Sequence, residues 1–160
     1  MVLPIFELLQ ERLSALAGPG VVARGILVFE PAERDLLAIV TQLKTAHGFD
    51  LFLDVTAIDW MSRTPRFEVV HHFYSTVHKV RVRLKTCVPE SDSTVDSLVP
   101  LYGSAAFMER ECHDMYGIRF RGNADLRPIL LYEGFVGHPL RKDYAKRHEQ
   151  PIVPYREPTL

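Results

Sequence analysis

The sequence predicts an α+β fold: a two-layer domain in which helices pack on a mixed β-sheet, followed by an irregular C-terminal extension. Two observations favour this class. Helix, strand and helix signals are followed by several strands in a row, which differs from the regular alternation of a βαβ repeat. The 160 residues, 47% of them hydrophobic, are enough for one domain with a core of its own.

The first part of the chain is predicted to form two helices with a strand between them. Apolar residues recur at helical spacing over about residues 5–16, and the Gly-Pro-Gly sequence at 18–20 ends that helix. Residues 21–29 are rich enough in Val, Ile and Leu for one strand. Pro31 suits the first turn of the second helix, and Gly48 suits its C-terminal end. The apolar face of this helix would comprise Leu36, Leu37, Ile39, Val40 and Leu43.

Three strands are predicted next, over residues 49–57, 67–75 and 80–85. The link between the last two strands is short, which suggests an antiparallel hairpin. The first strand alternates between apolar and acidic residues, with Phe52 on its other face. Its apolar face would comprise Phe49, Leu51, Leu53, Val55 and Ala57.

A second helical region is predicted in the C-terminal half. Residues 95–99 suggest a short helical stretch, and residues 104–117 a longer helix that ends at a glycine. Cys112 lies in the apolar stripe of the longer helix and is interpreted as a core residue. The rest of the chain is expected to be irregular, with a single domain over residues 1–145 and an extended tail over residues 146–160.

Composition excludes several classes of protein. The net charge of −1 argues against a general nucleic-acid binder, which needs a basic excess. No apolar run is long enough to span a bilayer, and the N-terminus lacks the features of a secretory signal. The two cysteines form no Cys-x-x-Cys pair, so a self-contained iron–sulfur protein or zinc module is not expected. A cytosolic location is the default interpretation.

The longer helix places a carboxylate at an unfavourable position. Asp114 lies in the last turn, where the helix dipole disfavours negative charge. Arg110, one turn earlier, can pair with it. We therefore predict a charge network that attaches the C-terminal segment to this helix; the functional alternative is a general acid/base pair of Glu109 or Glu111 with His113. Further cationic partners of Asp114 would come from Arg127, Arg141 and Lys142.

A second unusual run covers residues 135–144. Gly137 permits a positive φ and Pro139 fixes the chain direction, so the run is predicted to be a shaped loop. Such a loop usually presents its side chains to something, although a solvated connector is the alternative. The presented groups would be His138, Arg141, Lys142 and Asp143.

Two other functions are less favoured. A metal site could draw on His71, His72 and His78, but the first two would face opposite sides of a strand and are interpreted as exposed strand histidines. A nucleic-acid module could use a stripe of cations on the last predicted strand, but the stripe is interpreted as the polar face of that strand. The stripe comprises Arg81, Arg83 and Lys85.

Two runs, residues 109–118 and 137–144, resemble one family of subunits of respiratory NADH–quinone oxidoreductase (complex I). This is the family of the bacterial C subunit, which is the thirty-kilodalton subunit of the mitochondrial enzyme. The likeness covers about residues 30–145, including residues 125–130. The chain departs from the family at Asn123-Ala124, where His-Pro is usual, and at Pro128, where a second basic residue is usual.

The resemblance implies a subunit of the hydrophilic arm of a proton-translocating complex, without catalytic or metal-binding residues. FMN and iron–sulfur clusters would belong to other subunits, and this chain would contact the quinone-pocket (D-like) and cluster-bearing subunits, at the cytoplasmic face of a bacterial inner membrane. The alternative host is a related membrane-bound hydrogenase-type complex. The expected docking or structural residues are Glu109, Arg110, Glu111, Asp114, Gly117, Arg127, Gly137, His138, Pro139, Arg141, Lys142 and Asp143.

Overall fold

The structure, a computed structural model, describes residues 3–150. Three α-helices occur in this range: α1 (Pro4–Ala17), α2 (Leu36–Thr45) and α3 (Ala105–Tyr116). Single 3₁₀ turns are η1 (Glu33–Asp35) and η2 (Glu90–Asp92). The strands are β1 (Val21–Ala23), β2 (Ile26–Phe29), β3 (Leu51–Asp59), β4 (Phe67–Ser75), β5 (Val80–Val88), β6 (Thr94–Asp96) and β7 (Arg119–Arg121).

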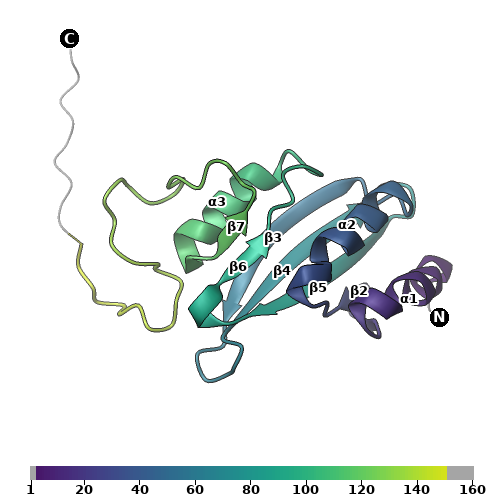
Figure 1. Cartoon of the computed structure of the whole chain (residues 1–160), viewed down its shortest axis with the longest axis horizontal. Helices are drawn as coiled ribbons and strands as arrows, with labels where there is room; N and C mark the ends of the chain where they lie inside the picture. The colour runs from purple at the N-terminus through teal and green to yellow at the C-terminus, as the bar shows by residue number, and fades with distance from the viewer. Residues whose placement is uncertain (1–2, 151–160) are drawn as a thin grey trace, which may run out of the picture.

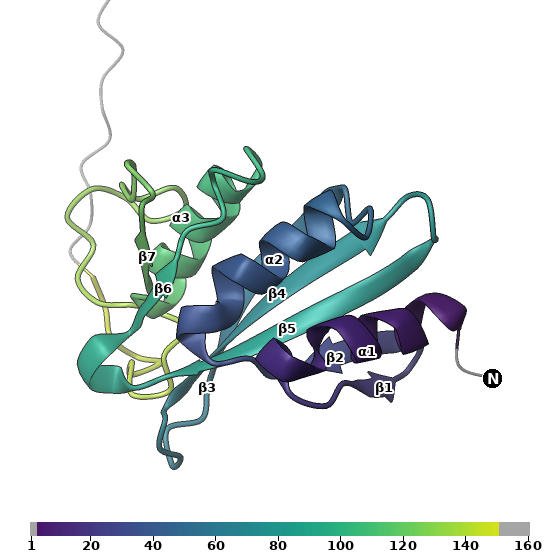
Figure 2. The ribbon, with the colours of Figure 1, turned by 45° about the vertical axis from the view of Figure 1, so that its right-hand side comes forward.

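Five of these strands form one mixed sheet, in the order β1-β2-β5-β4-β3. β2 runs parallel to β5, and the other neighbouring pairs are antiparallel. Figures 1 and 2 show α1 and α2 lying over one face of this sheet, with α3 beside β3. β6 and β7 form a separate parallel pair. The predicted α+β class, with helices packed on a mixed sheet, is confirmed.

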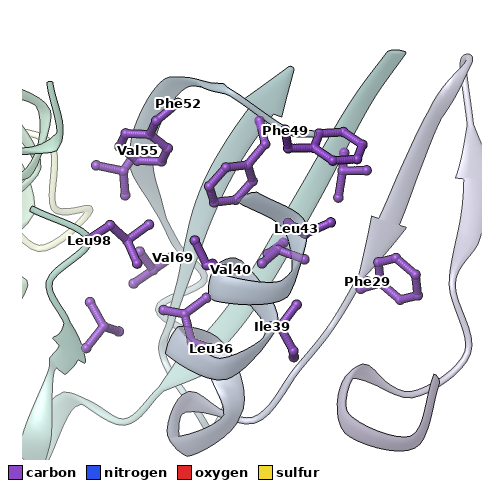
Figure 3. Packing of buried hydrophobic residues seen from close by; sticks show 14 of the residues in the cluster. Phe29, Leu36, Ile39, Val40, Leu43, Phe49, Phe52, Val55, Val69 and Leu98 are labelled. Atoms are coloured by element: carbon purple, nitrogen blue, oxygen red, sulfur yellow. The ribbon is translucent and has the colours of Figure 1, made fainter. Parts of the chain in front are cut away.

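The core lies between the sheet and the helices (Figure 3). Alternate residues of β4, from Phe67 through Val69 to Phe73, are buried against this layer. α2 contributes its predicted apolar face except Leu37, which is only partly buried. Because each fully buried Leu, Ile, Val or Phe stabilises the fold by roughly 1.5–3 kcal/mol, this layer is the main source of stability. The buried residues of α2 are Leu36, Ile39, Val40 and Leu43.

The buried face of β3 differs from the prediction. Phe52 is buried together with Val55, whereas Leu51 and Leu53 are exposed. The pairing of β3 with β4 shifts between Phe52 and Asp54, which marks a β-bulge. A bulge inserts one extra residue and so changes which side chains face the core. A strict two-residue alternation therefore gave the wrong face for this half of the strand.

Two boundaries in the first third of the chain also differ. The single strand predicted over residues 21–29 is a hairpin, because Arg24 and Gly25 both have positive φ (52° and 76°) and turn the chain between β1 and β2. A two-residue loop of this kind matches the twist of paired strands. The helix expected from Pro31 begins with the turn η1, and its regular part starts only at Leu36.

The helical stretch predicted at residues 95–99 is wrong. Residues 94–96 form β6, which pairs with β7 in the region predicted to be irregular. The register joins Val95 to Phe120, and both side chains are buried. Strands of three residues are too short to show a periodicity, so a distant partner decides their conformation.

His71, interpreted as an exposed strand residue, is instead buried at the centre of the sheet. It pairs with Val55 on one side and Leu84 on the other. Neither ring nitrogen has a hydrogen-bond partner among residues 3–150. Burial therefore lowers the pKa of His71 to about 3, with a smaller contribution from His72, and the ring is neutral at physiological pH.

We expect His71 to make the protein acid-sensitive. In the unfolded chain a histidine has a pKa of about 6.5, so below this pH the unfolded state binds a proton that the folded state refuses. The free energy of unfolding should fall by about 1.4 kcal/mol per pH unit from pH 6.5 towards the folded pKa. The variant His71→Leu should lack this loss, as measured by urea unfolding at pH 7, 6, 5 and 4. His78→Gln, in the exposed turn after β4, is the control and should follow the wild type; parallel curves for His71→Leu and the wild type would contradict the prediction.

Candidate functional site

Helix α3 is the centre of the region in which the predicted site residues gather. Its buried side includes Ala105 and Cys112, which confirms Cys112 as a core residue. Burial raises the pKa of the Cys112 thiol well above its usual value, so the thiol is protonated and unreactive. Gly117 ends the helix with φ of 74°, and its N–H donates to the carbonyl of His113 at 2.7 Å. This is the glycine-terminated helix that the sequence predicts.

Glu109 is a buried structural carboxylate. It accepts hydrogen bonds from the Ser97 hydroxyl (2.8 Å), the Leu98 N–H (2.7 Å) and the side-chain amide of Asn123 (2.9 Å). Burial raises the pKa of Glu109, and the three hydrogen bonds oppose this shift. His113 contacts the carbonyl of Ile118 instead (2.8 Å), so the alternative acid/base pair with Glu109 does not form. The other carboxylate considered for that pair, at Glu111, is exposed.

Asp114 is buried, but its partners are not the predicted cations. Its Oδ2 accepts the N–H groups of Ile129 (2.8 Å), Leu130 (2.9 Å) and Leu131 (3.2 Å). Within residues 3–150 no ion pair includes Asp114. Burial raises the pKa of this carboxyl, but the three N–H donors outweigh it and hold the pKa below its usual value. Successive backbone N–H groups of a turn form an anion-binding concavity, which the sequence does not reveal.

Arg110 binds the same loop through its carbonyl groups. Its guanidinium donates to the carbonyls of Arg127 and Pro128, both at 2.9 Å, and lies 3.8 Å from Asp125. Arg127 itself is exposed and pairs with Asp125 at 2.8 Å. α3 therefore holds residues 125–131 from both sides of the peptide unit: Asp114 accepts from its N–H groups and Arg110 donates to its carbonyls. The predicted attachment of this segment to α3 exists, but backbone groups form most of it.

The segment of residues 137–143, here called the cap segment, closes the C-terminal end of α3. His138 Nδ1 lies 2.9 Å from the Asp114 carbonyl, and the Leu140 N–H donates to the Met115 carbonyl (3.1 Å). Arg141 Nε donates to the Tyr116 carbonyl at 2.6 Å. The last carbonyls of a helix have no partner within the helix, so these donors satisfy them. Figure 1 shows the chain after β7 running beside α3.

Two glycines allow this close approach. A Cβ at Gly117 would lie 2.5 Å from His138 Nε2 and 2.6 Å from Arg141 Nη2. A Cβ at Gly137, which has φ of 96°, would lie 2.9 Å from the Tyr144 ring. Pro139 is partly buried between them. The predicted shaped loop therefore exists, but it turns His138 and Arg141 inward onto the helix.

The cap segment is also attached to the end of the main sheet. Arg66 forms a two-point bond with Asp59 (2.9 and 2.7 Å) and contacts Asp143 at 3.0 Å and Glu90 at 2.6 Å. The Lys142 N–H donates to Asp59 at 2.8 Å. The Arg66 side chain holds the pKa of the Asp59 carboxyl far below its usual range, with burial acting in the opposite direction. Two charged residues at the ends of β3 and β4 thus fix the position of the cap segment.

Asp59, Arg66 and Asn123 are site residues that the sequence reasoning missed. Asp59 and Arg66 flank the Trp60 loop, and only the tertiary structure brings them to residues 142–143. Asn123 occupies one of the positions at which the chain departs from its family pattern, and there it bonds Glu109. The Lys142 ammonium remains at the surface, 6.0 Å from the centre of the Trp60 ring.

Within residues 3–150, no three histidine, cysteine or carboxylate side chains lie close enough to hold a metal ion. His113 and His138 line a small cavity of about 140 Å³ with Asp114, but their ring centres are 6.1 Å apart and each Nδ1 contacts a backbone carbonyl. In the same part of the chain, no helix is both long and apolar enough to cross a membrane.

Comparison with known proteins identifies the family. Residues 29–150 match the family described as the respiratory-chain NADH dehydrogenase 30 Kd subunit. The chain belongs to this family, and the resemblance inferred from its two runs is confirmed. Membership places it among the subunits of NADH-quinone oxidoreductase complexes.

Individual relatives agree with this assignment. The C subunit of NADH-quinone oxidoreductase from Geotalea uraniireducens is 40% identical over 121 residues, which cover 76% of this chain and 74% of the relative. The protein of the same name from Geobacter sulfurreducens is 41% identical over 122 residues, 76% of this chain and 75% of the relative. A Bdellovibrio bacteriovorus protein, named as a combined C/D subunit, is 40% identical over 123 residues, which cover 77% of this chain but 22% of that longer protein.

Two solved structures share the fold. A trypsin-resistant fragment of Nqo5 superimposes with a TM-score of 0.66 at 29% identity, covering 75% of this chain and 97% of the fragment. A chain of an archaeal respiratory complex, the membrane-bound sulfane sulfur reductase, gives a TM-score of 0.73 at 27% identity, covering 88% of this chain and 85% of that chain.

The bonds of Asp114 lead to a stability prediction. Asp114→Ala leaves three backbone N–H groups without their acceptor, so the free energy of unfolding should fall by about 1–3 kcal/mol. Asp114→Asn keeps an acceptor oxygen but no charge and should lose less. Glu111→Ala, on the exposed side of the same helix, is the matched control and should change stability by roughly 0.5 kcal/mol or less.

The same bonds give a pH dependence. Because the folded pKa of Asp114 is lowered, its contribution is complete above the unfolded value of about 3.9 and is lost as the pH falls through the folded pKa. Wild type and Asp114→Ala should therefore converge in strong acid when chemical unfolding is measured from pH 7 to 2. An unchanged or raised melting temperature of Asp114→Ala at pH 7 would contradict the structural role.

Proposed function

We propose that this chain is a cofactor-free accessory subunit of the hydrophilic arm of a proton-translocating NADH-quinone oxidoreductase. It supports electron transfer from NADH to quinone by docking on the quinone-pocket (D-like) subunit and on cluster-bearing subunits, and other subunits of the complex hold its FMN and iron–sulfur clusters. Through these subunits it is held at the cytoplasmic face of a bacterial inner membrane. Family membership and the names of its relatives support this assignment.

The observation that carries the docking proposal is the orientation of the segment after β7. Its polar groups face inward onto α3 and Asp59, whereas its large apolar side chains face outward. Leu130, Val136 and Leu140 are 62%, 68% and 52% exposed. Exposed apolar groups that gather on one segment are typical of a surface that a partner covers.

The fused relative supports the choice of partner. In the Bdellovibrio protein, whose name combines the letters C and D, a region similar to this chain shares one polypeptide with further sequence. We infer from this name that the D-like subunit is the main partner. Glu111, Arg127 and Lys142, which are exposed, are then available as polar contacts around the apolar side chains.

We further propose the division into a domain over residues 1–145 and a tail over residues 146–160. The start of the tail returns to the domain, because Gln150 donates to the Val136 carbonyl (2.9 Å) and the Tyr144 hydroxyl (2.7 Å). The apolar residues further along the tail, Ile152, Val153 and Tyr155, lie outside the described residues.

A second host is supported by one observation. The likeness to a chain of the archaeal sulfane sulfur reductase covers most of both chains. A related membrane-bound complex of the hydrogenase type would use the same docking surface with another electron donor. Identification of the proteins that co-purify with the tagged chain from its native host distinguishes the two: an NADH-oxidising flavoprotein supports the first proposal.

A charge placed on the exposed apolar segment should block docking without unfolding the domain. Val136→Glu should keep the wild-type melting temperature within about 2 °C, because the side chain is solvent-exposed, and should co-purify poorly with the D-like subunit. Val77→Glu is the matched control: Val77 is 75% exposed in the turn after β4, and this variant should assemble normally. Equal assembly of both variants would contradict docking through this segment.

A further inference from the structure

The face of the main sheet that turns away from α1 and α2 has an unusual composition. A solvent-facing sheet surface is normally polar at alternate positions. Here the cations of β5 have apolar or aromatic neighbours: Arg81 pairs with Ile26 of β2 and Tyr74 of β4, and Arg83 pairs with Val28 of β2. Directly paired residues lie on the same face, so cations and apolar groups share this surface. In Figures 1 and 2, α1 and α2 lie on the opposite side.

Two of the three cations on this face lack an internal partner. Lys85 is neutralised by Glu68 at 2.9 Å. By contrast, Arg81 and Arg83 have no carboxylate within 4.0 Å and no side-chain hydrogen bond among residues 3–150. The Nε of Arg83 is buried and still has no acceptor. A buried donor of this kind is rare in a complete interface, because burial removes its water.

The two arginines line a shallow cavity of about 310 Å³. Apolar side chains, Ile26 and Leu53, form part of its wall. One carboxylate, Asp54, is also present, but it reaches neither arginine within ion-pair distance. The cavity therefore combines two uncompensated cations with an apolar floor. The sixth group in its wall is His72, whose pKa is lowered by burial and by the neighbouring arginines.

The geometry points to a second docking surface on this open sheet face, which takes an acidic and partly apolar segment of a neighbouring subunit. Two carboxylates of that segment would pair with Arg81 and Arg83, and its apolar side chains would cover Ile26 and Leu53. This inference rests on the proposed function for its partner, which is another member of the same complex. It concerns a surface separate from the segment that packs on α3.

Other ligands fit the surface less well. A small anion would satisfy the arginines but leave the apolar floor in contact with water. An RNA strand would require exposed aromatic rings for stacking and a basic excess, whereas Tyr74 is half-buried, Lys85 is neutralised and the net charge is −1. A protein segment with both carboxylates and apolar groups matches both features.

The first test reverses the charge of the surface in the full chain. Arg81→Glu with Arg83→Glu should leave the melting temperature near that of the wild type, because both side chains lie on the open face without internal bonds. The double variant should co-purify roughly tenfold less of the neighbouring subunits from the native host, because like charges then meet. Arg34→Glu, whose side chain is 85% exposed and contacts only Asp35, is the control and should assemble normally.

The second test does not depend on a loss of assembly. Arg81→Lys with Arg83→Lys keeps the charge and introduces amines that a zero-length carbodiimide joins to nearby carboxylates. In the assembled complex, cross-links from positions 81 and 83 to Asp or Glu residues of another subunit are expected. Cross-links confined to this chain, or full assembly of the double glutamate variant, would overturn the inference.

The outcomes separate this inference from the proposed function. If the wild-type chain co-purifies with no other subunit, the proposed function itself fails. If the wild type assembles and the double glutamate variant assembles equally, only the sheet-face inference fails. Saturable binding of inorganic phosphate or of a single-stranded RNA to the wild-type chain, lost in the double glutamate variant, would instead assign the surface to a small anion or to RNA and refute the docking of a protein segment.

Discussion

The arrangement of the C-terminal third depends on one requirement: the carbonyl groups at the end of α3 must find hydrogen-bond donors inside the protein. The cap segment supplies these donors from His138, Leu140 and Arg141. Because Gly117 has no side chain, the donors reach the helix end directly. The long irregular chain after β7 is therefore held in place by a helix terminus, without regular structure of its own.

This attachment extends to the sheet through a small number of polar groups. The same cap segment reaches Asp59 and Arg66, whose paired charges lie where β3 ends and β4 begins. Asp114 and Arg110 hold the preceding loop by accepting from its N–H groups and donating to its carbonyls. The helix, the loop and the sheet end form one connected unit, because each contact uses a different polar group of the same elements.

Satisfying the polar groups internally determines which side chains remain outside. The backbone of the segment bonds inward, so Leu130, Val136 and Leu140 have no apolar surface of their own to cover and point to solvent. On the sheet face opposite α1 and α2, the core is complete on one side, and Arg81 and Arg83 have no ion-pair partner within residues 3–150 on the other. Both surfaces are stable enough to persist but incomplete without a neighbour, as expected for a subunit that acts within a complex.

The sequence determined the features that depend on local pattern. Helical spacing and terminal glycines located the three helices, and alternation located the three long strands, because these signals repeat over many residues. The two runs that surround α3 and the cap segment were sufficient to indicate the family. Tertiary structure decided the rest: the bulge after Phe52, the pairing of β6 with β7, the burial of His71 and the backbone partners of Asp114. Each of these depends on groups that are distant in the chain and meet only when the core closes, so no local pattern could encode them.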